Sequence, residues 1–212
     1  MLRFLVLLLP SFGLMAQPVS VTVTSNKDNP VFQAVVYLVP HSQEANQAPP
    51  NDVSVMDQID RQFVPHILPI QKGSKVIFPN SDSIKHHVYS FSPTKRFELK
   101  LYQNSKAESL LFEKDGEVEL GCNVHDWMLA YIWVVDTPYF VKTTETGQAL
   151  LDVPEGKYTL RVWHPRIQDD LDTLAQEINV LGSTDLNVNL TKDLLEDLSL
   201  FEDQTDGFSD YD

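Results

Sequence analysis

The chain has 212 residues, of which 42% are hydrophobic, and its 16 basic and 30 acidic side chains give a formal net charge of −14 at pH 7. This length and composition exclude a disordered chain and allow one large domain or two small ones. The negative charge argues against binding to nucleic acid or to anionic lipid surfaces, and it favours a partner with a basic surface.

The first residues have the pattern of an export signal. Arg3 brings a positive charge, residues 4–9 form a short apolar core, and the small residue Ala16 precedes Gln17. We therefore expect residues 1–16 to be a signal peptide and the mature protein to lie in the periplasm. The apolar run is shorter than the roughly 20 residues of a membrane span, so we expect no stable span, with a retained N-terminal anchor as the alternative.

Short strand-like runs follow one another along the next hundred residues. They cover residues 19–24, 34–39, 59–70 with interrupting prolines, 75–78, 86–91, 97–102, 108–112, 117–120 and 131–135. The first two runs are expected to form a strand pair, whereas residues 41–54 are polar and aperiodic, which indicates an exposed connection. Because convincing helices are lacking, we predict an all-β sandwich over residues 17–136.

Asp136-Thr137-Pro138 indicates a domain boundary. Five further strand candidates follow it, at residues 139–144, 149–153, 157–164, 174–180 and 185–190, with turns between them. They predict a small second β-sandwich over residues 137–191. Residues 192–212 are crowded with acidic side chains opposed only by Lys192, and they are predicted to be an acidic tail in which a helical turn near residues 194–200 is an option.

The segment Cys122-Asn123-Val124-His125-Asp126-Trp127-Met128 holds the only cysteine of the chain. A single cysteine forms no internal disulfide, so Cys122 is a free thiol, an intermolecular link or a metal ligand. With a second imidazole from elsewhere, the thiolate, the imidazole of His125 and the thioether of Met128 are the ligand set of a blue-copper electron-transfer centre. Zinc catalysis is disfavoured, because it requires nitrogen or oxygen ligands and an open water position.

The second imidazole has to come from His41, His66, His86, His87 or His164. His86 and His87 follow a strand and a turn, from which a side chain can point toward the ligand loop. Adjacent residues of a strand face opposite ways, so at most one of the two reaches the metal, and the pattern does not choose between them. His66 and His164 are expected to be structural and His41 to be solvated.

Two segments resemble known copper proteins. Residues 76–88, Val-Ile-Phe-Pro-Asn-Ser-Asp-Ser-Ile-Lys-His-His-Val, resemble the plastocyanin-type segment that supplies the first histidine ligand. This resemblance places His86 at the ligand position and His87 where such proteins usually carry asparagine. The Cys-x-x-His-x-x-Met loop is similar to the ligand loop of amicyanin, which accepts electrons from methylamine dehydrogenase, with Asp126 in place of a proline.

Most of residues 19–190 is similar to exported cupredoxin-like proteins labelled methylamine utilisation proteins. Residues 62–66, 78–82, 125–128 and 152–164 carry this similarity. It implies a cupredoxin Greek-key sandwich followed by a small transthyretin-like or carboxypeptidase-regulatory-like β-sandwich.

The same resemblance implies one mononuclear type 1 copper site with the ligands His86, Cys122, His125 and Met128. The expected function is transfer of single electrons to or from a redox partner, such as a cytochrome or a dehydrogenase with a basic surface, without enzymatic activity. The alternatives are a Cu(I) binding or delivery protein and a metal-free interaction protein.

Overall fold

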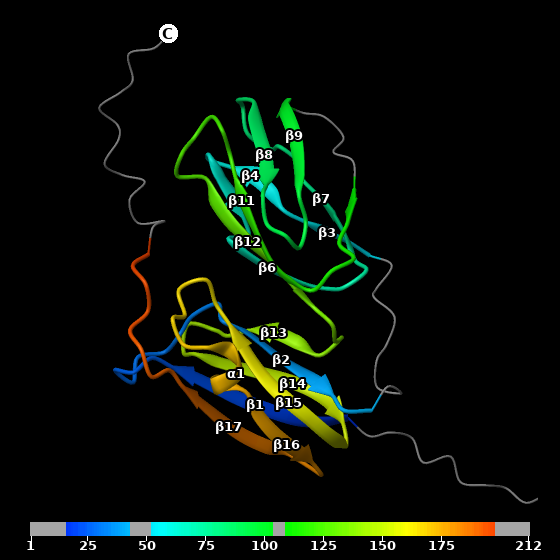
Figure 1. Ribbon diagram of the computed structural model, residues 1–212, viewed down its shortest axis with the longest axis vertical. Coiled ribbons are helices and arrows are strands. Elements are labelled where there is room, and N and C mark those ends of the chain that lie inside the picture. Colours follow the sequence, from blue (N-terminus) through cyan, green and yellow to red (C-terminus); the bar gives the residue numbers. More distant parts are fainter. Residues whose placement is uncertain (1–15, 43–51, 104–108, 198–212) are drawn as a thin grey trace, which may run out of the picture.

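The computed structural model describes residues 16–42, 52–103 and 109–197. Figure 1 shows two β-sheet bodies stacked one above the other, which we call the upper and the lower sandwich. Within the described residues the only helix is α1 (Leu171–Leu174), so the prediction of an all-β chain is confirmed. No helix in these ranges is long and apolar enough to cross a membrane. The predicted signal peptide, apart from Ala16, lies outside the described residues.

The upper sandwich is formed by the middle of the chain. Its strands are β3 (Val53–Val55), β4 (Asp57–Ile59), β5 (Gln62–Val64), β6 (Ile67–Gln71), β7 (Lys75–Ile77), β8 (His86–Ser90), β9 (Phe97–Tyr102), β10 (Leu110–Leu111), β11 (Gly116–Gly121) and β12 (Leu129–Val135). The main sheet has the order β6-β12-β11-β8-β9, and a second sheet has the order β10-β7-β3. A buried cluster that includes Val76 and Phe78 on one side and Leu120 and Ile132 on the other fills the space between them.

The lower sandwich combines both ends of the described chain. Its elements are β1 (Ala16–Thr24), β2 (Val35–Pro40), β13 (Phe140–Lys142), β14 (Gln148–Pro154), β15 (Gly156–Trp163), α1, β16 (Gln176–Val180) and β17 (Thr184–Asn189). The two sheets have the orders β14-β1-β17 and β13-β2-β15-β16. In β1, Val19, Val21 and Val23 alternate with polar residues and are fully buried, as expected for a strand with one face on a core.

The first two strands of the described chain do not pair as the predicted domain division requires. Residues 17–40 were assigned to the first domain, but β1 pairs with β14 and β17, and β2 pairs with β13 and β15. The predicted pair of β1 and β2 is therefore wrong, because the two strands lie in opposite sheets. The upper sandwich is inserted between β2 and β13 of the lower one, an order that local periodicity does not encode.

The region 57–71 also differs from its prediction. A single strand interrupted by prolines was expected over residues 59–70, whereas β4 and β5 form a hairpin that is followed by β6. The hairpin turns at Asp60 and Arg61, whose φ angles of 52° and 60° have the sign that a tight two-residue turn requires. A short strand, β3, lies where the exposed connection was predicted to end.

Strand β12 joins the two sandwiches because both of its faces are covered. Ala130, Ile132 and Val134 belong to the upper core, while Trp133 and Val135 pack in a third cluster at the junction. There Trp133 stacks on Trp163 of β15, with ring centroids 4.4 Å apart and an interplanar angle of 8°. The first residues of β12 follow directly on the predicted ligand loop, so the lower sandwich supports the strand that carries this loop.

Candidate metal centre

Three of the predicted ligands converge at one end of the upper sandwich. His86 is the first residue of β8, Cys122 follows the last residue of β11, and His125 lies in the loop before β12. Their ligand atoms all lie within 4.8 Å of one another. His86 is fully buried and Cys122 is 4% exposed, whereas His125 is only partly buried. The three side chains therefore form a cluster of candidate donors, with His125 at its more exposed side.

The ring nitrogens of the two histidines are arranged as a metal site requires. The Nδ1 atoms of His86 and His125 are buried and find no hydrogen-bond partner within the described residues. Nε2 of His86 lies 2.7 Å from Oδ2 of Asp82, so this nitrogen carries the proton and Nδ1 keeps its lone pair. Unpaired buried nitrogens are costly unless something binds them, and a metal ion is what their convergence with the Cys122 thiol fits.

The neighbouring His87 lies outside this cluster. Its Nε2 is 2.9 Å from Oε1 of Glu98 on β9, as expected for a side chain on the opposite side of the strand from His86. Nδ1 of His87 is also buried and unpaired among the described residues, but of these two histidines it is His86 that lies beside Cys122 and His125.

Met128 closes the ligand loop at the end of a turn. Its backbone NH donates to the carbonyl of His125 at 3.1 Å, and its side chain is 2% exposed in the same buried cluster as Cys122. Within the turn, the backbone NH of Val124 points at Sγ of Cys122 at 3.4 Å. This contact suits a thiolate, which is a better acceptor than a thiol.

Asp82 is the site residue that sequence reasoning missed. Besides His86, it accepts the backbone NH groups of Asp60 and Arg61 at 3.0 and 2.8 Å, which ties the β4–β5 hairpin to the ligand. Burial raises the pKa of Asp82, but the hydrogen bonds from Arg61, His86 and Asp60 outweigh it and leave the pKa below its usual value. The signal in the sequence that could have identified Asp82 is its position four residues before His86.

Asn80 orders the loop that carries Asp82. Its Nδ2 donates to the carbonyls of Ile84 and Tyr102, both at 2.9 Å, and its Oδ1 accepts the backbone NH of Asp82 at 2.9 Å. The loop is therefore held at both ends before any ligand binds.

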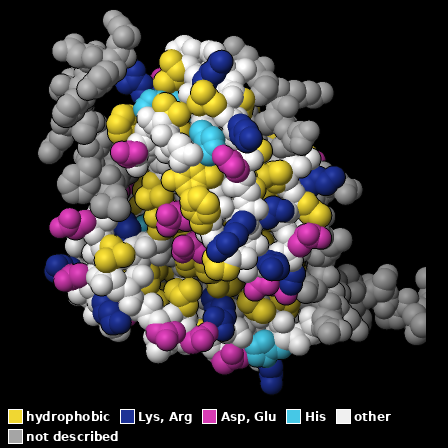
Figure 2. Space-filling model, turned by 45° about the horizontal axis from the view of Figure 1, so that its top comes forward, with side chains coloured by type: hydrophobic (Ala, Val, Ile, Leu, Met, Phe, Trp, Pro, Cys, Tyr) yellow, Lys and Arg dark blue, Asp and Glu magenta, His cyan; other side chains and the backbone are white. Residues whose placement is uncertain are grey.

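The surroundings of His125 favour its neutral form. Burial, His86 and the cationic Arg61 together lower its pKa, and the neutral imidazole is the form that binds a metal. The ring of Trp127 lies 5.2 Å from that of His125 at an angle of 53°. Figure 2 shows that histidine side chains reach the surface at this end of the molecule among hydrophobic ones.

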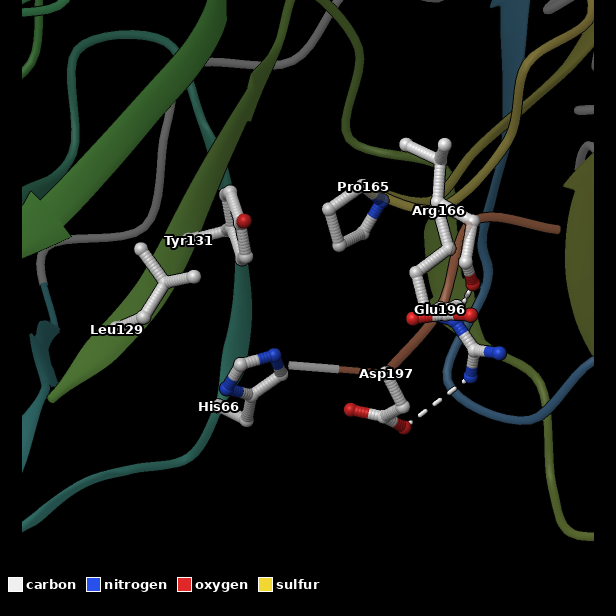
Figure 3. Close-up of a pocket in the computed structure, with 8 residues that line it drawn as sticks. His66, Leu129, Tyr131, Pro165, Arg166, Glu196 and Asp197 are labelled. Carbon is white, nitrogen blue, oxygen red and sulfur yellow. Dashed lines mark hydrogen bonds and ion pairs between the residues drawn. The ribbon is translucent and has the colours of Figure 1, made fainter. Parts of the chain in front are cut away.

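The remaining histidines lie away from the cluster. His66 lines a hollow of about 340 Å³ between the two sandwiches, with Tyr131 on one wall and Arg166 and Asp197 on the other (Figure 3). His164 is buried near it and accepts the backbone NH of Arg166 at 3.2 Å. His41 is exposed and lies 3.0 Å from a carboxylate oxygen of Glu177.

Part of the acidic tail contributes to the same hollow. Arg166 donates to the carbonyl of Leu195 at 2.6 Å and to Asp197 at 3.1 Å, which holds residues 195–197 against the junction. Residues 194–197 form no helical turn, and the rest of the predicted tail, residues 198–212, lies outside the described residues.

No protein-family model matches the sequence, and no curated protein sequence is similar to it. Among solved structures, a purple cupredoxin from Nitrosopumilus maritimus is 20% identical with a TM-score of 0.35, over 39% of this chain and 99% of that one. Amicyanin from Paracoccus versutus is 17% identical with a TM-score of 0.36, over 50% of this chain and 100% of that one. A copper-containing nitrite reductase from Thermus scotoductus is 18% identical with a TM-score of 0.38, over 53% of this chain and 28% of that one.

Proposed function

We propose that the chain is a type 1 copper protein that carries single electrons, with His86, Cys122 and His125 as strong ligands and Met128 as the weak axial ligand. The convergence of His86 and His125, each with a buried Nδ1 that is unpartnered in the described ranges, beside the single thiol is the observation that carries this proposal. Two histidines, one thiolate and one thioether are the donor set that suits copper in both oxidation states. When bound, copper would supply one-electron redox chemistry.

The surroundings of the ligands favour a carrier. Asp82 fixes the ring of His86 and the backbone NH of Val124 contacts the sulfur of Cys122, so two of the ligands are held before the metal binds. A site whose ligands hardly move when the charge changes exchanges electrons readily. Four protein ligands leave no open position for a substrate, so we propose that the protein is not an enzyme.

The partly exposed edge of His125 is the proposed point of electron exchange. We propose that the protein works in the periplasm, on the basis of its signal-like first residues, and that its redox partner is a cytochrome or a dehydrogenase. The formal charge of −14 favours a partner with a basic surface, because opposite charges raise the rate of encounter.

The proposal is tested by adding Cu(II) to the purified protein. We expect one copper per chain, an intense visible absorption band from the thiolate and the electron paramagnetic signal of a type 1 centre. The Cys122→Ser variant should lose the band, whereas the matched His41→Gln variant, which changes an exposed histidine far from the site, should keep it. A wild-type protein that stays colourless and binds no copper would contradict the proposal.

A redox titration separates the carrier from a copper-delivery protein. A carrier should be reduced and reoxidised reversibly with copper retained in both states. Release of the metal on either step would instead support delivery.

A further inference from the structure

A hollow of about 430 Å³ lies beside the candidate metal centre. Cys122 and Met128 both line it, and its outer part is formed by Glu119 and Asp126, which are exposed. Neither histidine of the cluster belongs to this lining. The hollow therefore approaches the centre from the sulfur side, away from the exposed edge of His125.

Two aromatic side chains shape the wall of this hollow. A Cβ atom at Gly121 would lie 2.6 Å from the ring of Tyr89, so only glycine lets this ring lie against the backbone immediately before Cys122. The ring of Phe91, which is 74% exposed, packs 5.1 Å from that of Tyr89. Both residues line the hollow.

The described lining of the hollow is negatively charged. The described lining of the hollow includes the carboxylates of Glu119 and Asp126 and contains neither lysine nor arginine. At the His125 edge, the guanidinium of Arg61 and the carboxylate of Asp82 both act electrostatically on the ring of His125, with opposite signs. A cation is therefore attracted to the hollow by two carboxylates without an opposing cation in the described lining.

We propose that this hollow is the entry route of the metal: a copper cation first meets Glu119 and Asp126 and then the sulfur atoms of Cys122 and Met128. This inference rests on the proposed copper function. Binding replaces the proton of the Cys122 thiol with the metal, the proton leaves to solvent, and no electron is transferred in this step. Soft sulfur donors are suited to capturing Cu(I), and the imidazoles complete the site afterwards.

The route is tested without copper by the reactivity of the only thiol. The apoprotein is treated with two methanethiosulfonate reagents of similar size, one with an ammonium group and one with a sulfonate. In each case the thiolate forms a mixed disulfide and displaces methanesulfinate. At low salt the cationic reagent should react about tenfold faster, and Glu119→Gln should reduce this preference about threefold.

The matched control is Asp185→Asn, which removes the same charge from an exposed position on β17 of the lower sandwich and should leave the preference unchanged. Equal rates for the two reagents in the wild type, or a preference that Glu119→Gln does not alter, would overturn the route.

Stopped-flow measurements of copper loading, with a copper salt alone, then compare entry through the hollow with entry at the His125 edge. Glu119→Gln should slow the second-order loading rate about threefold, and Arg61→Gln should leave it unchanged. Faster loading of Arg61→Gln with no effect of Glu119→Gln would place entry at the His125 edge and overturn the inference. Absence of copper binding in the wild type would instead defeat the proposed function, while the thiol reactions would still report on the hollow.

Discussion

Histidines gather at two places in the described chain, the cluster of His86, Cys122 and His125 and the junction hollow beside His66 and His164. His86 and His164 are both buried, with exposed fractions of 0% and 9%, so burial does not distinguish them. The difference lies in what remains unpaired. In the cluster the Nδ1 atoms of His86 and His125 have no hydrogen-bond partner within the described residues, whereas Nδ1 of His164 accepts the backbone NH of Arg166.

The carboxylates at the two places, Asp82 and Asp197, also differ in what they contact. Asp82 contacts His86 and leaves the other ring nitrogen available, which is the arrangement of a ligand with a supporting acceptor. Asp197 pairs with Arg166 at the junction, so the opposite charges neutralise each other there. The comparison teaches that a free ring nitrogen alone does not mark a ligand, since Nδ1 of His87 is also buried and unpaired in the part of the chain that the structure describes; what distinguishes His86 and His125 is that they converge with Cys122.

The largest expected difference between the two places is in metal affinity. His86→Ala should lower the affinity for copper more than about 100-fold and abolish the visible band, because loss of a supporting residue alone costs 10–100-fold. His66→Ala should leave both unchanged. Equilibrium dialysis with metal analysis measures the affinities, and equal losses in the two variants would contradict the division.

Low pH should reduce the free energy of unfolding through His164 at the junction. Burial lowers the pKa of His164 to about 4, with further contributions from Arg166 and His66, while the unfolded chain has the ordinary value of about 6.5. The unfolded state then binds more protons between these two values, so the free energy of unfolding is fully retained above pH 6.5 and falls as the pH decreases toward 4. The loss attributable to His164 is up to about 3 kcal/mol.

Urea titrations of the apoprotein at several pH values measure this loss. His164→Gln should remove the corresponding part of the pH dependence, whereas His41→Gln, at an exposed position, should retain it. An unchanged pH profile in His164→Gln would show that the junction does not depend on this group.

The sequence predicted the local features of the site better than its surroundings. The Cys-x-x-His-x-x-Met spacing and the Asn-Ser-Asp turn before His86 are local, and the structure brings Cys122, His125 and His86 together. The pairing of β1 with β14 and β17 was not predictable in the same way, because strand alternation shows which face is buried but not which partner covers it. Asp82 was missed because its role depends on the β4–β5 hairpin, whose turn at Asp60 and Arg61 lacks the usual glycine.

The smallest expected effect on copper affinity is that of changing Asp82, which supports His86. Asp82→Asn removes the negative charge that faces His86 and weakens the hydrogen bond that orients its ring. The affinity for copper should fall 10–100-fold, which corresponds to about 1.4–2.7 kcal/mol. The visible band should persist, because all four proposed ligands remain. Competition with a chelator of known affinity measures the change.

Glu98→Gln is the matched control, since Glu98 forms a similar contact of 2.9 Å with the neighbouring His87, which lies outside the cluster. This variant should bind copper as the wild type does. If both substitutions lowered the affinity equally, the effect would come from the net charge of the region, and Asp82 would have no particular part in orienting His86. If only Asp82→Asn lowers it, the free Nδ1 of His86 owes its position to the carboxylate that holds the opposite side of the ring.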